Sequence, residues 1–558
     1  MGAWVSVARC SERESAVRKL VSAIGAAVTV SLAVTACGGG GGSASGGVAG
    51  GGASAPAADG VCTPDKVGGE LTYAPTVLAT SLDPYSALGG TAQTGPEELA
   101  IYGSLLRFDE KTGTFEGEVA QGITPNADAS EWTLKLRPEA KFGNGDPVDA
   151  AAVKASIERY IDPKGTSRIK GEGKYIKSME VVDPLTLKFV LDAPWGFFPL
   201  ELSAGGGAVG AMGMVQNVKV LNQVGVSAFS QNPAGGAAGP YEVESWNAPQ
   251  QVVLKAKKDW WGGPVCIQKL TFVGLTNAQA RVDGMASGDV QMSTLSRDPV
   301  LIAKTIKEYP YASTVDQGNS MVEFNVTNPE LSDLRVRQAI AAAIDPKVIS
   351  NRAFGGQALA GSGLVYPVEE AGITKGTQGL PYDPAKAKQL VAQLKGEGFK
   401  LTFEMLAGSS PASNVQAAIA IKSLLDAAGF SITVTPIDTA QAISRVYSTR
   451  NFDMWLGGQV GPLATEFASL FRFNSQNLAN PYGFKDPAFD ATLVPLRAAK
   501  TTSELLAAMN GVQQEWNKSI PAVAYTSDQA VLVWAKNVHG LYFTRGITPY
   551  FNKAYITK

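Results

Sequence analysis

The sequence predicts an α/β protein with at least two lobes. The chain has 558 residues, more than a single hydrophobic core usually organises. Residues 401–405 alternate as a strand, residues 414–428 have helical spacing, and residues 432–434 alternate again. A crossover of this length places the two strands parallel in one sheet with the helix packed on it.

Composition indicates a globular protein and excludes a nucleic-acid binder. Apolar residues make up 45% of the chain and charged residues 18%, a balance typical of a chain that folds around a core. The 48 basic and 50 acidic side chains nearly cancel, and no strongly basic stretch remains to bind phosphates.

The N-terminus has the parts of an export signal. Arg18 and Lys19 precede an apolar run over residues 20–36, which ends in small residues before Cys37. This run is short for a membrane span, so residues 1–36 are interpreted as a signal peptide. The alternative is a marginal membrane anchor. Residues 38–60 are rich in Gly, Ala and Ser and predict a flexible tether that spans roughly 25–30 Å.

Strands and helices follow in mixed order. Alternation predicts strands over residues 131–137 and 181–190, and helical spacing predicts helices over 97–106 and 504–516. Residues 205–239 have no clear periodicity, and the last segment, residues 522–558, returns to strands.

Residues 323–350 are the best-defined stretch. A strand ends at Asn328, and Ser332 or Asp333 can cap a helix whose apolar face is buried and whose arginines are expected to point outward. Asp345 followed by Pro346 ends that helix and starts the next one. Asp383 and a following proline start a further helix in the same way.

This stretch, with its FN, RVRQA and AID segments, resembles the signature of solute-binding family 5, the binding lipoproteins of peptide- and nickel-type ABC importers. Further segments match that family in the same order along the chain: LDP at 82–84, WTLKLR at 132–137, KFGNGDP at 141–147, GPY at 239–241, DWWGG at 259–263 and SGDV at 287–290. The resemblance covers residues 69–558.

The resemblance implies a two-lobed periplasmic-binding-protein type II fold of cluster C, with an extra subdomain in the first lobe. We expect residues 37–65 to form a lipidated tether and residues 66–312 to form lobe I, with the subdomain at about 107–230. Residues 313–521 would form lobe II, and residues 522–558 would return to lobe I.

The cysteines fit an exported protein. Val34 to Cys37 resembles the bacterial lipobox, which implies that Cys37 carries lipid. Cys10 leaves with the signal peptide, so Cys62 and Cys266 remain as a pair outside the cytoplasm, where a disulfide can persist. The alternative is two separate buried thiols.

Catalytic chemistry is not indicated. The chain has one histidine, His539, in no recognisable nucleophile context, and it lacks a phosphate-binding loop. No spacing of carboxylates singles out an acid/base pair. A metal site built from several imidazoles is excluded, because the chain has one histidine. We therefore expect no enzyme activity, cofactor or metal, and a secreted hydrolase is the disfavoured alternative.

The resemblance places a ligand in the cleft between the lobes. The residues expected there are Tyr85, Ser86, Asn319, Met321, Trp455, Gly458 and Gln459, although Tyr85 and Trp455 could equally pack in a core. Peptide-binding relatives often carry a tryptophan and an aspartate in the loop after Trp455. Here Gln459 replaces that tryptophan and no acid follows, so a buried ligand ammonium would lose its partner.

The function implied is an extracytoplasmic lipoprotein receptor. It would capture a peptide-like or other medium-sized organic solute as a monomer and deliver it to an ABC permease driven by separate ATPase subunits. Its lipid anchor would hold it on the outer face of the cell membrane. A receptor for a sugar or siderophore-like ligand, or a surface adhesin or sensor without transport, are the alternatives on the same scaffold.

Overall fold

A computed structural model describes most of the chain from residue 60 onward. The described residues are 60–85, 95–109, 113–165, 167, 170–204, 212–233, 235–275, 277–296, 298–364, 379–409, 411–458, 470–477, 480–544 and 546–557. The chain divides into two compact units, Met1–Gly46 and Gly47–Lys558, and all described residues belong to the second.

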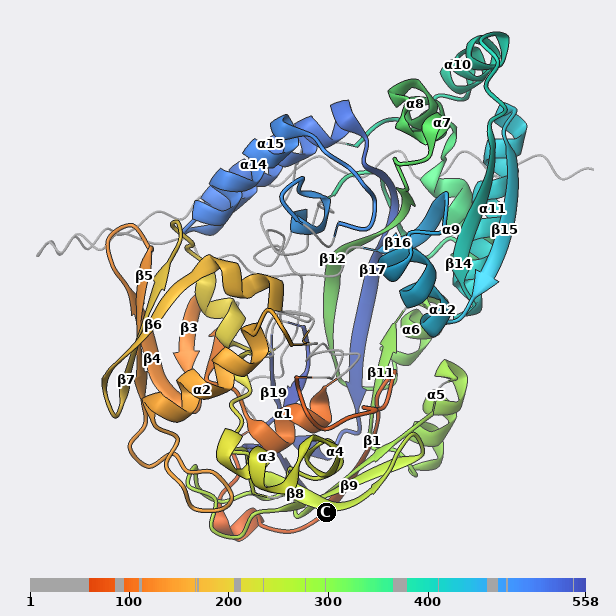
Figure 1. The fold of residues 1–558 in the computed structure, drawn as a ribbon. Coiled ribbons are helices and arrows are strands. Elements are labelled where there is room, and N and C mark those ends of the chain that lie inside the picture. Colours follow the sequence, from red (N-terminus) through yellow and green to blue (C-terminus); the bar gives the residue numbers. More distant parts are fainter. Residues whose placement is uncertain are drawn as a thin grey trace, which may run out of the picture. The chain divides into compact units, whose positions relative to one another are not determined.

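Within these residues the main sheet has 11 strands, and its two halves share a pair of long strands (Figure 1). Ten of the strands follow one another in the order β15 (Ser431–Ile437), β14 (Thr402–Gly408), β16 (Met454–Gly458), β12 (Tyr311–Phe324), β17 (Ala522–Trp534), β11 (Met292–Ser296), β1 (Glu70–Ala74), β10 (Lys269–Val273), β9 (Gln251–Ala256) and β8 (Tyr241–Asn247). The short β13 (Leu359–Ala360) pairs with β17.

The predicted α/β unit over residues 401–434 is confirmed. β14 and β15 are parallel neighbours, and α11 (Ala412–Ala428) connects them and packs on both. On the other half of the sheet, β1 is parallel to both β10 and β11. The sheet is therefore mixed, because β12 and β17 run antiparallel to each other between the two parallel groups.

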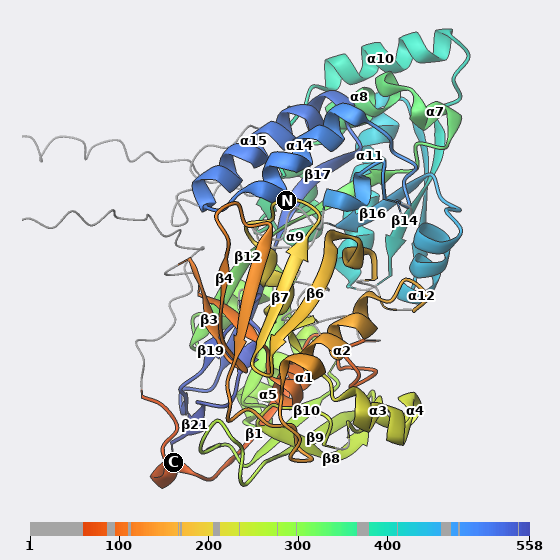
Figure 2. The ribbon, with the colours of Figure 1, turned by 60° about the vertical axis from the view of Figure 1, so that its left-hand side comes forward.

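A second sheet holds the segment expected to be the extra subdomain (Figure 2). Its strands lie in the order β4 (Ala120–Pro125), β5 (Glu131–Leu136), β7 (Thr186–Leu191) and β6 (Ile176–Asp183), with α2 (Ala150–Ile161) packed on β6 and β7. The single strand predicted over 181–190 is wrong, because a turn divides it. Asp183 Oδ1 accepts a hydrogen bond from the Leu185 amide at 2.8 Å, and Pro184 cannot donate to a sheet.

A run of helices follows β12. They are α7 (Pro329–Ser332), α8 (Leu334–Ala343), α9 (Pro346–Phe354) and α10 (Pro384–Gly396), and all of these except α8 begin with a proline. Asp333, Asp345 and Asp383 each cap the helix that follows, as predicted. The apolar sides of these helices join β14, β16 and the adjoining ends of β12 and β17 in one hydrophobic cluster of their own.

The expectation that both arginines of α8 point outward is wrong for Arg337, which is 7% exposed. Its guanidinium donates to the Leu331 and Ser332 carbonyls at the end of α7 and to the Ser519 and Ile520 carbonyls at the end of α15 (Thr502–Ser519), at 2.6–3.0 Å. The last carbonyls of a helix lack partners within the helix, so one buried cation satisfies two helix ends.

The remaining described elements are short or lie at the ends of the two sheets. They are η1 (Pro64–Lys66), α1 (Pro96–Tyr102), β2 (Leu106–Asp109), β3 (Thr114–Gly117), η2 (Lys170–Tyr175), η3 (Phe198–Leu202), α3 (Val218–Val224), α4 (Val226–Phe229), α5 (Ala278–Ser287), α6 (Pro299–Thr305), α12 (Thr439–Ala442), η6 (Ile443–Ser448), η8 (Phe471–Phe473), α14 (Pro487–Ala498), β18 (Val538–His539), β19 (Tyr542–Phe543), β20 (Pro549–Tyr550) and β21 (Tyr555–Ile556).

β12 and β17 connect the two halves of the main sheet. The first part of β12 pairs with the end of β17 beside β11, and the last part of β12 pairs with the start of β17 beside β16. Between these parts the register of β12 shifts twice, at Val315/Asn319 and at Ser320/Met321. Such irregularities interrupt the ladder of hydrogen bonds and bend a strand locally.

Candidate functional site

The predicted ligand residues meet in part, where β12 pairs with β16. Met321 of β12 pairs with Gly457 of β16, which places Trp455 and Gly458 on the strand next to it. Met321 is fully buried and belongs to the largest hydrophobic cluster, whereas Trp455 is half-buried against that cluster. These residues lie next to the register shifts of β12, where the two halves of the main sheet join.

For the predicted residue Asn319 the structure describes the backbone alone. The backbone of Asn319 belongs to β12, immediately after the first register shift, and pairs with Ser527 of β17. Ser86, Gln459 and Cys37 lie outside the described residues.

A buried ion pair lies across the strands at this point. The side chain of Glu323 is fully buried, and it accepts hydrogen bonds of 2.8 Å from Arg472 Nη2 and from the Tyr482 hydroxyl. Arg472 Nη2 also donates to the Gly458 carbonyl at 3.0 Å, so the cation ties the end of β16 to β12. Burial raises the pKa of Glu323, and the positive charge of Arg472 opposes that rise.

Gly457 makes room for this pair. A side chain at this position would overlap the Glu323 carboxylate and crowd the Trp455 indole, so only glycine leaves space for both groups to lie across the strand. The Trp455 Nε1 atom is buried and has no hydrogen-bond partner among the described residues. A buried N–H without a partner is costly, and this donor is available to a bound molecule.

Tyr85 comes from a different part of the fold, the loop after β1. In that loop the Asp83 carboxylate forms a bidentate ion pair with the guanidinium of Arg159 in α2, with N–O distances of 2.9 and 2.6 Å. The side chain of Gln216 forms hydrogen bonds with both groups. The Arg159 guanidinium lies 4.0 Å from the centre of the Tyr85 ring, and Tyr160 packs beside it. These contacts hold the Tyr85 ring against α2.

Sequence reasoning missed the charged residues that organise both places. Glu323 was visible as a carboxylate in an otherwise apolar strand, MVEF, which is a signal for a buried partner. Asp83 belongs to the LDP segment, and no feature of that segment predicts a buried partner. Their partners Arg472 and Arg159 lie 149 and 76 positions away, and no local pattern links them.

Two cysteines that lie 204 positions apart are joined. Cys62 and Cys266 form a disulfide with a Cα–Cα distance of 5.5 Å. This bond fastens the start of the described chain beside β10, and Gly68 also donates its amide hydrogen to the Cys266 carbonyl at 2.8 Å.

Among the described residues, no helix is both long and apolar enough to cross a membrane. The same residues contain no group of three or more His, Cys, Asp or Glu side chains placed to hold a metal ion.

Solved structures with the same fold define the class of this protein. AgaA of A. tumefaciens R10, solved in complex with agropinic acid, is 24% identical, has a TM-score of 0.71 and matches 88% of this chain and 99% of its own. OppA of Haemophilus influenzae, solved with the peptide RPPGFSPFR, is 17% identical, has a TM-score of 0.73 and matches 88% of this chain and all of its own. The α/β fold is thus that of the periplasmic binding proteins, as the sequence predicted.

The family follows from the sequence match. The model of bacterial extracellular solute-binding proteins, family 5 (middle region), matches residues 114–480, and the chain belongs to this family. The glutathione-binding protein GsiB of Salmonella paratyphi A is 28% identical over 371 residues, which cover 66% of this chain and 69% of GsiB. The family consists of substrate-binding proteins and not of enzymes, which agrees with the absence of catalytic motifs in the sequence.

Proposed function

We propose that this protein is the substrate receptor of an ABC importer and closes two lobes around an organic solute. The two lobes would be residues 66–312 with 522–558, including a subdomain at about 107–230, and residues 313–521. The observation that carries this proposal is the course of β12 and β17, two long strands that both halves of the main sheet share and whose register shifts where the halves join. A hinge at these two adjacent strands would let the proposed lobes close around a ligand.

The hydrophobic core is divided in part, which supports a movement of this kind. One cluster holds the inner faces of α8 to α11 with β14 and β16, and it is distinct from the clusters around β1, β10 and β11. The largest cluster also takes in Phe473, Leu505 and Trp516 of the proposed second lobe, so the part that can move as a unit is the one around α8 to α11.

The ligand we propose is peptide-like or another medium-sized organic solute. GsiB is named for glutathione, and OppA and AgaA were solved with a peptide and with agropinic acid. The solute would be contacted by Tyr85, Ser86, Asn319, Met321, Trp455, Gly458 and Gln459. Trp455 has the strongest support, because its buried indole N–H can donate to a ligand oxygen.

Export and anchoring belong to the same proposal. Residues 1–36 would be removed as a signal peptide, Cys37 would carry lipid, and the tether would leave the monomeric receptor free to meet its permease and ATPase subunits. The disulfide between Cys62 and Cys266 supports maturation outside the cytoplasm, where such bonds persist. Replacing Cys37 by Ala should release the receptor from the membrane fraction without changing its affinity for solute.

Native mass spectrometry of the receptor purified from its host tests the ligand, because tightly bound solutes remain attached. The identified solute is then titrated by calorimetry into the wild type and into Trp455→Phe, which keeps an aromatic ring and removes the donor. We expect Trp455→Phe to bind at least about 10-fold more weakly. Uptake of the solute should stop when the gene is deleted. Turnover of the solute by the purified protein, or uptake unchanged by the deletion, would refute the proposal.

A further inference from the structure

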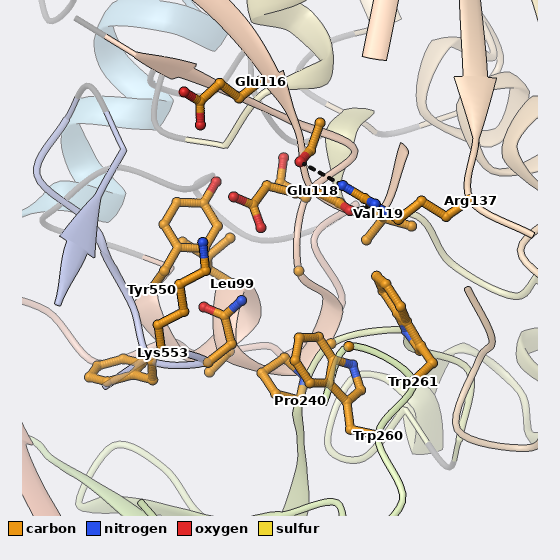
Figure 3. A pocket seen from close by; sticks show the side chains of 18 of the residues that line it. Leu99, Glu116, Glu118, Val119, Arg137, Pro240, Trp260, Trp261, Tyr550 and Lys553 are labelled. Carbon is orange, nitrogen blue, oxygen red and sulfur yellow. Dashed lines mark hydrogen bonds between the residues drawn. The ribbon is translucent and has the colours of Figure 1, made fainter. Parts of the chain in front are cut away.

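A cavity of about 340 Å³ shares no residue with the candidate site at the junction of β12 and β16 (Figure 3). Its walls come from α1, the turn between β3 and β4, the segment after β5, the turn after β9 and the C-terminal residues 550–553. All of these segments fall within the proposed lobe I and its subdomain. A molecule bound here would therefore not need the two lobes to close.

Two indole rings form one side of the cavity. The Nε1 atoms of Trp260 and Trp261 both donate to the carbonyl of Ala238 at 2.9 Å, and the ring centres lie 5.1 Å apart with planes tilted by 51°. Because one carbonyl fixes both rings, they present aromatic surface at little further cost in side-chain entropy.

Carboxylates face these rings. In Figure 3 Glu116 and Glu118 lie on the side of the cavity away from Trp260, and Tyr550 and Lys553 lie across from Trp261. The side chain of Glu118 is 16% exposed. Burial raises its pKa, although the charges of Lys553 and Arg107 act in the opposite direction. A carboxylate in this position gains from a further positive charge.

The arginine in the cavity wall is already engaged. Arg137 donates through Nε to the Glu118 carbonyl at 2.8 Å and through Nη2 to the Gly117 carbonyl at 3.3 Å. Behind the wall, Arg107 pairs with the carboxylates of Glu116 and Glu118. The lining holds Glu116, Glu118 and Glu139, and Arg107, Arg137 and Lys553 balance their charges. The preference for a cation therefore comes from the indole faces and from the position of the Glu118 carboxylate across from them.

A buried hydroxyl on the cavity wall also lacks a good partner. Tyr550 is 5% exposed and its ring stacks on Tyr542 at 4.6 Å, but its buried hydroxyl makes no hydrogen bond of normal geometry to the described residues, although Ser104 and Glu118 lie near it. Buried polar groups are almost always paired, so this hydroxyl can take a polar atom of a bound molecule as its partner.

We propose that this cavity is a second binding site, separate from the interlobe cleft, for a small organic ammonium ion. The ammonium group would lie over the Trp260 and Trp261 rings, which attract cations through their electron-rich faces. Glu118 supplies the opposite charge and Tyr550 a polar contact.

The test uses three molecules of nearly the same shape: choline, which is a cation, 3,3-dimethylbutan-1-ol, which is neutral, and 3,3-dimethylbutanoate, which is an anion. Each is titrated by calorimetry into the purified full-length protein. We expect choline to bind at least about 10-fold more tightly than the other two, because only it gains the cation–π and ion-pair contacts. Equal affinities for all three, or a preference for the anion, would overturn the proposal.

Variants locate the site. Glu118→Gln and Trp261→Leu should each weaken choline binding by about 10-fold or more. Glu180→Gln is the matched control, because it removes one carboxylate from an exposed position in β6 of the same sheet and should leave the affinity unchanged. If Glu118→Gln does not fold, Trp261→Leu carries the same test together with Glu139→Gln, since Glu139 also lines the cavity. Choline binding lost in Trp455→Ala but kept in Trp261→Leu would place the ion in the interlobe cleft and refute the second site.

Discussion

Replacing Arg472 by Met tests whether its ion pair with Glu323 stabilises the junction of β12 and β16. The change leaves the Glu323 carboxylate fully buried with the Tyr482 hydroxyl as its one remaining partner among the described residues, and it removes the hydrogen bond to the Gly458 carbonyl. Removing one member of a buried pair typically costs about 3–5 kcal/mol, because the remaining charge is uncompensated.

The loss should depend on pH in a defined direction. Burial already raises the pKa of Glu323 above its ordinary 4.5, and without Arg472 it rises further. A carboxyl group whose pKa is higher in the folded state favours folding at low pH, and this contribution is lost as pH rises through the folded-state pKa. Arg472→Met should therefore be most destabilised relative to the wild type near pH 8 and should recover as the pH falls toward 5.

Urea unfolding of the wild type, Arg472→Met and the double variant Glu323→Gln/Arg472→Met at pH 5 and pH 8 measures both effects. The double variant should recover much of the loss, since it removes the uncompensated charge. Arg352→Met, on the exposed side of α9, is the control and should change stability by less than about 0.5 kcal/mol. The reasoning fails if Arg472→Met costs under about 1 kcal/mol, or if its loss is the same at both pH values.

Three further results are expected. Gly457→Ala should lower the melting temperature and weaken solute binding, because its methyl group overlaps the Glu323 carboxylate; wild-type behaviour in both measurements would contradict the packing described. Arg337→Met should reduce the free energy of unfolding by about 2–4 kcal/mol, since four carbonyls at the ends of α7 and α15 lose their donor, and Arg337→Lys should restore less than half of it. Burial lowers the pKa of Lys257 to about 8, so the stability of the wild type should gain a contribution between pH 8 and 10 as this amine loses its proton in the folded state; in Lys257→Met the difference in unfolding free energy between these pH values should be smaller.

Local signals predicted the elements well where the cause lies within a few residues. Asp333, Asp345 and Asp383 start helices because a carboxylate can accept the first free amide hydrogens, and a proline follows Asp345 and Asp383 directly. The strand predicted over 181–190 failed for an equally local reason, since Asp183 and Pro184 together form a turn that outweighs the alternation around them.

The candidate site was predictable only in outline. The family motifs pointed to Trp455 and to the end of β12.

The burial of Arg337 could not be predicted either, because helical spacing leaves this residue outside the apolar face of α8. Its burial depends on α15, which ends about 180 residues later and presents the carbonyls that the guanidinium satisfies. Spacing along one helix contains no information about such a partner.

The sequence alone determined the α/β class, the caps that start the helices and the solute-binding family, because each of these is written in residues that are neighbours along the chain. Only the tertiary structure decided which charges are buried together. Glu323, Arg472 and Tyr482 meet because β12 and β16 pair, and Trp260, Trp261 and Tyr550 surround one cavity because the C-terminal segment returns to α1. Such contacts arise from folding the whole chain, so the energetics of both sites depend on distances that the order of residues does not give.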